Sequence, residues 1–276
     1  MIAAESSAPG VPQILRFLDT VHARYGYDLR GYAARSMHRR VRAAVAHAGL
    51  HDVDELRERI ATDPDCFARV LALLTVRVTE MFRDPAFFRA LRLRVVPMLR
   101  TYPFINVWIG GCASGEEAYS LAILLFEEGL LDRAQIYATD LSAPAIEQAK
   151  QGVYPANQLA AFSDNYRAAG GTGQLDDYTT TAYGRIALLE HLRRRIVFFQ
   201  HDLVADHILG EMQLVMCRNV MIYFGADLRQ GVLRKLALSL CPGGFLGLGP
   251  SERPAGDAGR SFCDFAPEER IFRRGC

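Results

Sequence analysis

The sequence predicts an α/β domain with a largely parallel sheet, preceded by an all-helical region. Up to about residue 100, apolar residues recur with helical periodicity. From Ile105 onwards, short apolar runs alternate with helical stretches, at 105–110, 136–139, 196–199, 213–217 and 245–248. A glycine-rich loop, GGCASG at 110–115, follows the first of these runs and leads straight into an amphipathic helix.

Five helices are expected before the first strand. The second closes at Gly49, a common C-terminal residue, and the third opens on Asp52 with Glu55 in a capping-box pattern. Asp63-Pro64 and Asp84-Pro85 open the last two, because proline suits the first helical turn. Their inward-facing residues are expected at Ile14, Leu18, Val21 and Tyr25; Met37, Val41, Ala44, Val45 and Ala48; Phe67, Val70, Leu71 and Leu74; and Phe88, Leu91 and Val95.

The loop at 110–115 is suited to close approach of a ligand to the backbone, because glycine has no Cβ to obstruct it. It does not match the GxGxxG fingerprint of dehydrogenases, and it could also be a tight structural turn. Asp140 ends the second apolar run. An acidic residue roughly 20 residues past such a turn holds a ribose in nucleotide-binding folds. Asp140 could instead cap the helix that Ser142 and Pro144 begin.

Two further segments carry polar residues that core packing does not explain. Arg218-Asn219 stand between apolar blocks, after the run at 213–217, where an open α/β sheet directs polar residues into the ligand crevice. Arg83 lies ahead of the α/β domain, where it could cap a helix or reach over a cofactor. Residues 152–195 are too long for an ordinary connection and form either a small inserted subdomain or a mobile functional loop.

Composition narrows the class of protein. The net charge of +1 over 276 residues predicts no nucleic-acid partner. No run of about 18 apolar residues predicts a membrane span, and the first residues lack the pattern of a secretory signal. The six cysteines form no CxxC and accompany no histidine cluster, so we expect reduced thiols, no metal site and a cytoplasmic protein.

Four segments together resemble the chemotaxis receptor methyltransferases, the CheR-type protein-glutamate O-methyltransferases. They are VTEMFRDPAFF at 78–88, GCASGEEAYSLA at 111–122, ATDLS at 138–142 and CRNVMIYF at 217–224. The resemblance implies an N-terminal helical domain and linker at 1–84. It further implies a Rossmann-like methyltransferase domain at 85–276, with a small β-rich insert at about 152–195.

The resemblance also implies that the cofactor is S-adenosylmethionine, with S-adenosylhomocysteine as product and no metal. Arg77, Thr79 and Arg83 would approach the cofactor from the segment between the domains. The turn at Gly111 and the acid Glu117 would contact its methionyl part, and Asp140 would hold its ribose. The remaining implied contacts are Asp202 and Leu203 beside the adenine, and Asn219 and Val220 on the methionine side.

Methylation of a glutamate needs no general base, because a carboxylate with a pKa of about 4.3 is already ionised at pH 7. Arg83 is a candidate to hold the acceptor carboxylate, and Tyr223 to steer it by its hydroxyl; Tyr223 could equally be a packing residue. Arg35, Arg39 and Arg42 share one helical face, which is either solvated or complementary to a glutamate-rich helix of a receptor.

Other functions remain open at this point. The acceptor could be another signalling protein or a small acid, and the chain could be a non-enzymatic module that senses S-adenosylmethionine. Some family members use the β-rich insert to bind a peptide tail of the receptor. In this chain the segment AGGTGQLDDYTTT replaces a compact turn of that insert, so binding of such a tail is left open.

Overall fold

The computed structural model describes residues 10–74 and 79–275. Contacts divide the chain into two compact units, residues 1–76 with Tyr223–Arg229, and residues 77–222 with 230–276. Each unit is described by itself. Arg77, expected to approach the cofactor, lies outside the described residues.

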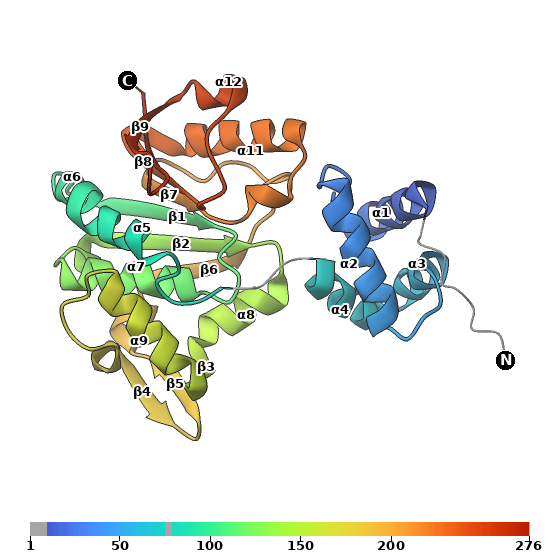
Figure 1. Ribbon diagram of the computed structural model, residues 1–276, viewed down its shortest axis with the longest axis horizontal. Coiled ribbons are helices and arrows are strands. Elements are labelled where there is room, and N and C mark those ends of the chain that lie inside the picture. The colour runs from blue at the N-terminus through green and yellow to red at the C-terminus, as the bar shows by residue number, and fades with distance from the viewer. Residues whose placement is uncertain (1–9, 75–78, 276) are drawn as a thin grey trace. The chain divides into compact units, whose positions relative to one another are not determined.

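The first unit is a helical bundle whose core contains the predicted inward-facing residues, except that Tyr25 is half-buried and Ala48, at the end of its helix, is exposed. Its helices are α1 (Val11–Tyr25), α2 (Ala34–His47), α3 (Val53–Thr62) and α4 (Pro64–Leu74) (Figure 1). The Asp52 side chain accepts a hydrogen bond from the Glu55 amide at 2.9 Å and so caps α3, as expected. Tyr25 stacks on Phe67, with ring centroids 3.6 Å apart, which joins α1 to α4.

The second unit is built on a seven-stranded sheet in the order β6-β2-β1-β7-β8-β10-β9. Strands β6, β2, β1, β7 and β8 are parallel, and β10 and β9 add an antiparallel edge. The predicted α/β class is therefore confirmed, and each apolar run lies in a strand. The strands are β1 (Ile105–Gly110), β2 (Ala134–Asp140), β6 (Ile196–Gln200), β7 (Met212–Cys217), β8 (Leu240–Leu248), β9 (Phe262–Ala266) and β10 (Ile271–Arg274).

Helices surround this sheet, and α7 is the most deeply buried of the long ones. Nine of its residues are buried, including Tyr119 and Ser120, so α7 packs on nearly all sides. The helices of this part are α5 (Pro85–Ala90), α6 (Val96–Leu99), α7 (Glu116–Glu127), α8 (Ala143–Gln151), α12 (Gly256–Gly259) and, from residue 230 onwards, α11 (Ala226–Ser239). A π-helical turn at Leu91–Val95 joins α5 to α6.

Residues 152–195 form a small subdomain, which decides between the two alternatives left by the sequence. It contains an antiparallel sheet in the order β3-β5-β4 and the helices α9 and α10. Their bounds are β3 (Val153–Pro155), α9 (Leu159–Ala168), β4 (Thr179–Ala182), β5 (Arg185–Leu188) and α10 (Glu190–Arg193).

The glycine-rich loop of this insert is attached to the last residue of α7. Glu127 accepts hydrogen bonds from the amide and hydroxyl of Thr172, both at 3.0 Å, and from the hydroxyls of Tyr166 and Tyr178. It also forms an ion pair with Arg92. Five donors therefore hold one buried carboxylate.

The cysteines follow the expectation in part. Cys66, Cys112, Cys217 and Cys241 are free and buried. Cys263 is disulfide-bonded, so the expectation of six reduced thiols is wrong at that residue.

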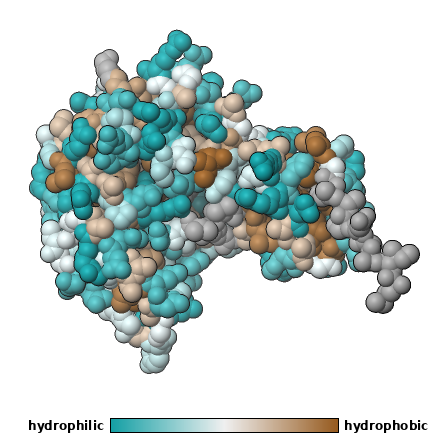
Figure 2. All heavy atoms as spheres, viewed as in Figure 1, coloured by the Kyte–Doolittle hydropathy of each residue, from teal (hydrophilic) through white to brown (hydrophobic). Residues whose placement is uncertain are grey.

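Hydrophilic residues are spread over the face shown in Figure 2. Among the helices of residues 10–74 and 79–275, none has the length and apolar character needed to cross a membrane.

Candidate active site

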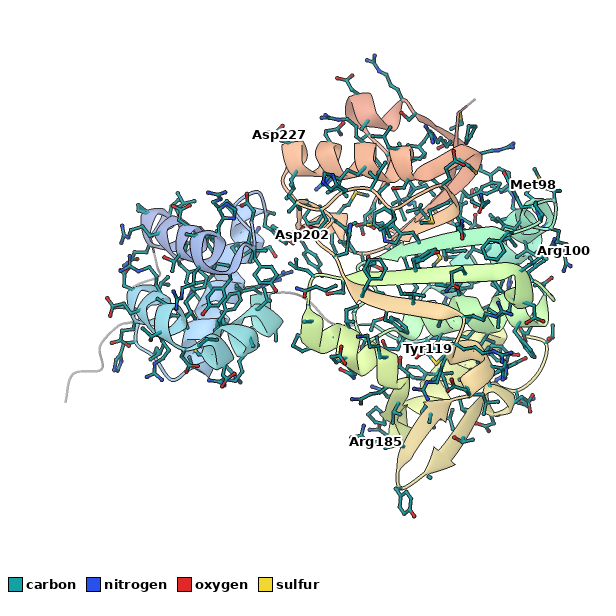
Figure 3. All side chains as sticks on the ribbon, turned by 180° about the vertical axis from the view of Figure 1, so that it is seen from behind. Met98, Arg100, Tyr119, Arg185, Asp202 and Asp227 are labelled. Carbon is teal, nitrogen blue, oxygen red and sulfur yellow. The ribbon has the colours of Figure 1, made fainter. Side chains whose placement is uncertain are left out.

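The candidate site lies at the carboxyl ends of the parallel strands β1, β2 and β7. In register, Gly110 of β1 is the partner of Thr139 of β2, and Ile109 is the partner of Met216 of β7. The residues that follow these strands therefore emerge at one edge of the sheet. Figure 3 shows Asp202, after β6, at this edge and Arg100, ahead of β1, at the opposite one.

The loop after β1 is closely packed against other predicted site residues. Gly111 has a φ of +80°, and a Cβ there would lie 2.4 Å from Cγ2 of Val220. A Cβ on Gly110 would lie 3.1 Å from Cδ2 of Leu203. Glycine is therefore required at 111 by both conformation and space. Gly111, Val220 and Leu203, predicted separately from three segments, meet here.

Asp140 holds this loop to the end of β2. Its Oδ2 accepts a hydrogen bond from the Ala113 amide and its Oδ1 one from the Ser142 amide, both at 2.9 Å. A carboxylate has about four lone-pair positions, so Asp140 can accept hydrogen bonds from hydroxyl groups of a ligand as well as from backbone amides. The helix after β2 is capped by the side chain of Ser142 rather than by Asp140.

Two glutamates begin α7. Glu116 is 4% exposed and accepts both of its side-chain hydrogen bonds from the Ser114 hydroxyl, at 2.8 and 3.0 Å. Burial raises its pKa. Glu117 faces a guanidinium instead: Nη1 of Arg218 lies 2.7 Å from its Oε2. Burial also raises the pKa of Glu117, while Arg218 and Arg83 act in the opposite direction.

Arg218, the residue after β7, connects three segments. Its side chain is 1% exposed, and its Nη2 donates to the Asp84 carboxylate at 2.7 Å and to the Arg83 carbonyl at 3.1 Å. Its guanidinium carbon lies 4.1 Å from the centre of the Phe87 ring. Sequence reasoning noticed Arg218 as unexplained but assigned it no role.

Asn219 adopts a left-handed conformation, with φ of 60°, that Glu252 holds in place. Oε2 of Glu252 accepts from the amides of Asn219 at 2.8 Å and Gly249 at 2.7 Å, and Oε1 from the Ile222 amide at 3.1 Å. Sequence reasoning missed Glu252. The only signal was an acid shortly after the glycine-rich end of β8.

Three other predicted residues have the following surroundings. Leu203 is buried, whereas Asp202 is half-buried and its carboxylate accepts the Val204 amide at 2.7 Å. Thr79 is half-buried in the second unit.

The two candidate catalytic residues fall in different units. Arg83 belongs to the second unit and is half-buried. Tyr223 belongs to the helical unit by its contacts: its carbonyl accepts the Ala33 amide at 2.8 Å, and the Arg40 guanidinium lies 4.2 Å from its ring centre. These contacts support the packing alternative for Tyr223, and its role in steering the acceptor stays a prediction.

The predicted basic face of α2 is exposed. Arg35, Arg39 and Arg42 are all solvent-facing, and no ion pair joins them to an acid within the described ranges.

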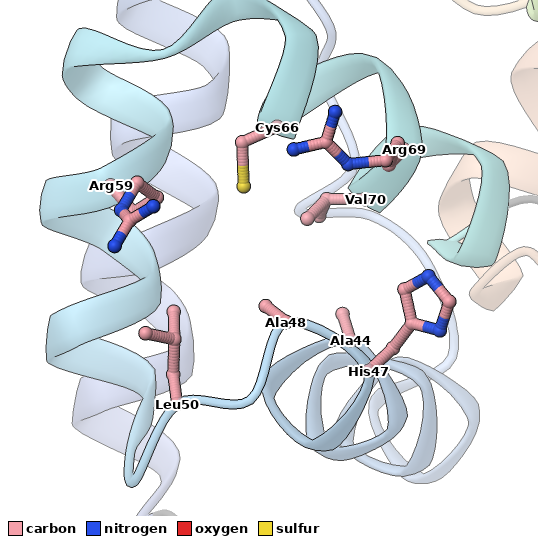
Figure 4. Close-up of a pocket in the computed structure, with 8 residues that line it drawn as sticks. All are labelled: Ala44, His47, Ala48, Leu50, Arg59, Cys66, Arg69 and Val70. Carbon is pink, nitrogen blue, oxygen red and sulfur yellow. The ribbon is translucent and has the colours of Figure 1, made fainter.

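The same helical unit holds a second basic feature, a pocket of about 170 Å³ between α2, α3 and α4 (Figure 4). Arg59, Arg69 and His47 lie on its wall, with Cys66 and Val70.

Two buried thiols lie near the site. Burial raises the pKa of Cys112 well above its ordinary value, and the carboxylates of Asp140 and Glu117 raise it further; burial does the same at Cys217. Both thiols therefore stay protonated, and a protonated thiol is a poor nucleophile. No cluster of three metal-ligating side chains occurs among the residues that the structure describes.

The residues at this edge fit S-adenosylmethionine. Glu117 offers a carboxylate to an ammonium group at the start of α7, and Asp140 offers lone pairs to ribose hydroxyls. The protonated thiols would not compete for a reactive methyl group. Glu117, Asp140, Asn219 and Val220 would hold the cofactor, which would supply an electrophilic methyl on sulfur.

Known families match both units. The model of the CheR methyltransferase SAM-binding domain matches residues 77–262, and the model of the CheR methyltransferase all-alpha domain matches residues 12–75. The Cher3 protein of Pseudomonas putida is 43% identical over 263 residues, covering 95% of this chain and 96% of its own.

Two further relatives carry chemotaxis names. The chemotaxis protein methyltransferase of Listeria monocytogenes is 30% identical over 241 residues, which is 87% of this chain and 89% of that protein. The chemotaxis protein methyltransferase Cher2 of Pseudomonas putida is 33% identical over 226 residues, or 77% of this chain and 80% of that protein.

Proposed function

We propose that this chain, which belongs to the CheR family of S-adenosylmethionine-dependent methyltransferases, methylates glutamate side chains of a chemoreceptor-like signalling protein. The acceptor would be a helical protein segment that carries the glutamates. Its product would be a glutamate methyl ester, released together with S-adenosylhomocysteine.

The reaction is a displacement at carbon. An oxygen of the ionised glutamate forms a bond to the methyl carbon while the bond from that carbon to sulfur breaks, and no proton moves. The protein must therefore supply alignment and exclude water rather than a base. Arg83 would hold the acceptor carboxylate, because a guanidinium matches a carboxylate with two parallel hydrogen bonds.

The observation that carries this proposal is the arrangement around Glu117. The candidate cofactor acid and the segment that bears Arg83 are both hydrogen-bonded to Arg218. Glu117 and Arg83, the candidate cofactor and acceptor residues, lie in one unit although they are distant in sequence, and this supports the proposal. The exposed arginines of α2 support a protein acceptor over a small acid, because a one-signed face favours an acidic partner.

The test is label transfer. The protein is incubated with methyl-labelled S-adenosylmethionine and membranes, with excess S-adenosylhomocysteine as the inhibited control. We expect label on a membrane protein band that is released by mild base, as methyl esters are. Label that resists base would contradict glutamate methylation. Label only on a small acid would identify another acceptor, and cofactor binding without transfer would indicate a sensing module.

A further inference from the structure

Arg218 is a buried charge at the meeting point of three segments. It follows β7, its partner Glu117 lies in the first turn of α7, and its partner Asp84 immediately precedes α5. The guanidinium is 1% exposed, and its Nε has no hydrogen-bond partner within the described structure.

Stability alone does not explain such an arrangement. Taking an arginine and its carboxylates out of water is costly, and well-packed apolar side chains often replace such sets without loss. The buried ion pairs of Arg218 with Glu117 and Asp84 instead fix the orientation of the groups that they join. The planar guanidinium of Arg218 donates in fixed directions, so its hydrogen bonds orient the Glu117 carboxylate, the Asp84 carboxylate and the Arg83 carbonyl.

We propose that Arg218 is a positioning residue that keeps the Glu117 carboxylate directed toward the cofactor amine and, through Asp84 and the Arg83 carbonyl, fixes the segment that presents Arg83. This inference rests on the proposed function. It adds that cofactor binding and acceptor alignment depend on one side chain that touches neither ligand.

The charges around Glu117 give this role a measurable consequence. Burial raises the pKa of Glu117, Arg218 is the largest influence that lowers it, Arg83 lowers it further and Glu252 raises it. Replacing Arg218 by an apolar residue would leave burial and Glu252 opposed only by Arg83. Glu117 would then take up a proton at a higher pH, and a protonated carboxyl attracts an ammonium group less strongly.

The experiment measures the dissociation constant of S-adenosylhomocysteine by calorimetry between pH 6 and pH 9. The variants are Arg218→Met, Arg218→Lys and Glu117→Gln. Each value is divided by that of the unaltered protein at the same pH, so that ionisation of the ligand amine cancels. Turnover at saturating cofactor is measured alongside.

For Arg218→Met we expect binding at least about tenfold weaker near pH 6, the scale of one lost charge-assisted hydrogen bond. The loss should shrink as pH rises. Glu117→Gln, which has no carboxylate at this position, should bind more weakly than the unaltered protein at every pH in this range. Arg218→Lys should retain most of the affinity but lose turnover, because an ammonium keeps the charge without the planar fork that holds Asp84 and the Arg83 carbonyl.

The matched control is Arg92→Met. Arg92 is also buried between two carboxylates, Glu127 and Glu128, at the other end of α7. The Arg92→Met substitution should lower the melting temperature. The ratio of its dissociation constant for S-adenosylhomocysteine to that of the unaltered protein should stay near one at every pH.

The outcomes separate the two claims. If the unaltered protein does not bind S-adenosylhomocysteine, the proposed function fails. If it binds, but the ratio for Arg218→Met is flat with pH or no different from that for Arg92→Met, the positioning role is overturned. If Arg218→Met does not fold, unchanged turnover in Arg218→Lys overturns it equally, and a selective loss of turnover supports it.

Discussion

Arg83 uses its main chain and side chain for different contacts. Its carbonyl accepts a hydrogen bond from Arg218, which fixes the backbone, while its guanidinium acts electrostatically on Glu117. A substitution that shortens the side chain therefore leaves the carbonyl contact available. This makes Arg83 suitable for separating catalysis from folding.

Arg83→Ala should lower kcat/KM by about two orders of magnitude or more, because the acceptor carboxylate loses its alignment in the transition state. Turnover is measured at saturating cofactor, with thermal melting as the folding control. Arg89→Ala, an exposed arginine on α5, serves as the matched variant. Arg83→Lys should rescue poorly. Near-normal turnover in Arg83→Ala would remove it from the catalytic candidates and leave Tyr223.

Asp140→Ala should weaken binding of S-adenosylhomocysteine by about 1–3 kcal/mol, the cost of leaving a buried hydrogen-bonding group without its partner. Both the ribose hydroxyls and the Ala113 amide would lose an acceptor. Calorimetry measures the affinity, and Asp132→Ala, an exposed acid ahead of β2, is the control. Affinity equal to that of the unaltered protein would exclude Asp140 from the cofactor site.

On the scale of elements, α7 connects the candidate site to the insert. Its first turn carries Glu116 and Glu117, and its last residue, Glu127, is held by the insert loop. Burial raises the pKa of Glu127, but the bonds from the Tyr166 hydroxyl, the Thr172 amide and Arg92 lower it by more, so its pKa is below the ordinary value. Glu127 is therefore ionised in the folded state at neutral pH.

A lowered pKa makes stability depend on pH. The unfolded state takes up the proton first as pH falls, so the stabilisation from Glu127 is complete above pH 4.5 and is lost as pH falls through its lower folded value. Urea unfolding between pH 3 and pH 7 should show this loss. Glu127→Gln should be less stable at neutral pH and show a weaker acid dependence. If the free energy of unfolding of Glu127→Gln depends on pH as that of the unaltered protein does, Glu127 does not contribute to the acid dependence of stability.

The sequence was sufficient to predict elements that are determined by residues close together in the chain. Apolar runs bounded by loops predicted the strands. The glycine-rich turn after the first run, and the acid that ends the second run, were local signals that marked Gly111 and Asp140 as candidates. Contacts between segments that are distant in the chain produce no recognisable pattern in the sequence. Arg218 pairs with Asp84 and Glu117 across 134 and 101 positions, and Glu252 reaches Asn219 across 33. Only the folded chain shows which carboxylate each donor meets.

On the scale of the whole molecule, the near-neutral net charge conceals an uneven distribution. The formal charge is +1, yet α2 exposes Arg35, Arg39 and Arg42 on one face. Exposed charges of this kind act mainly on the rate of association and lose their effect as salt screens them. An acidic acceptor helix would be attracted to this face before any contact with the reacting groups.

Arg39→Glu with Arg42→Glu should therefore impair methylation of the protein acceptor at low salt and leave the affinity for S-adenosylhomocysteine unchanged. The rate of the unaltered protein should fall as salt is added, and the difference between the two proteins should narrow. The matched control is Arg59→Glu with Arg69→Glu, which makes the same change of charge at the pocket of the same helical unit. If both pairs slow the reaction equally, net charge rather than the α2 face attracts the acceptor. If the α2 pair methylates at the normal rate at low salt, the face is merely solvated, and the acceptor is recognised elsewhere.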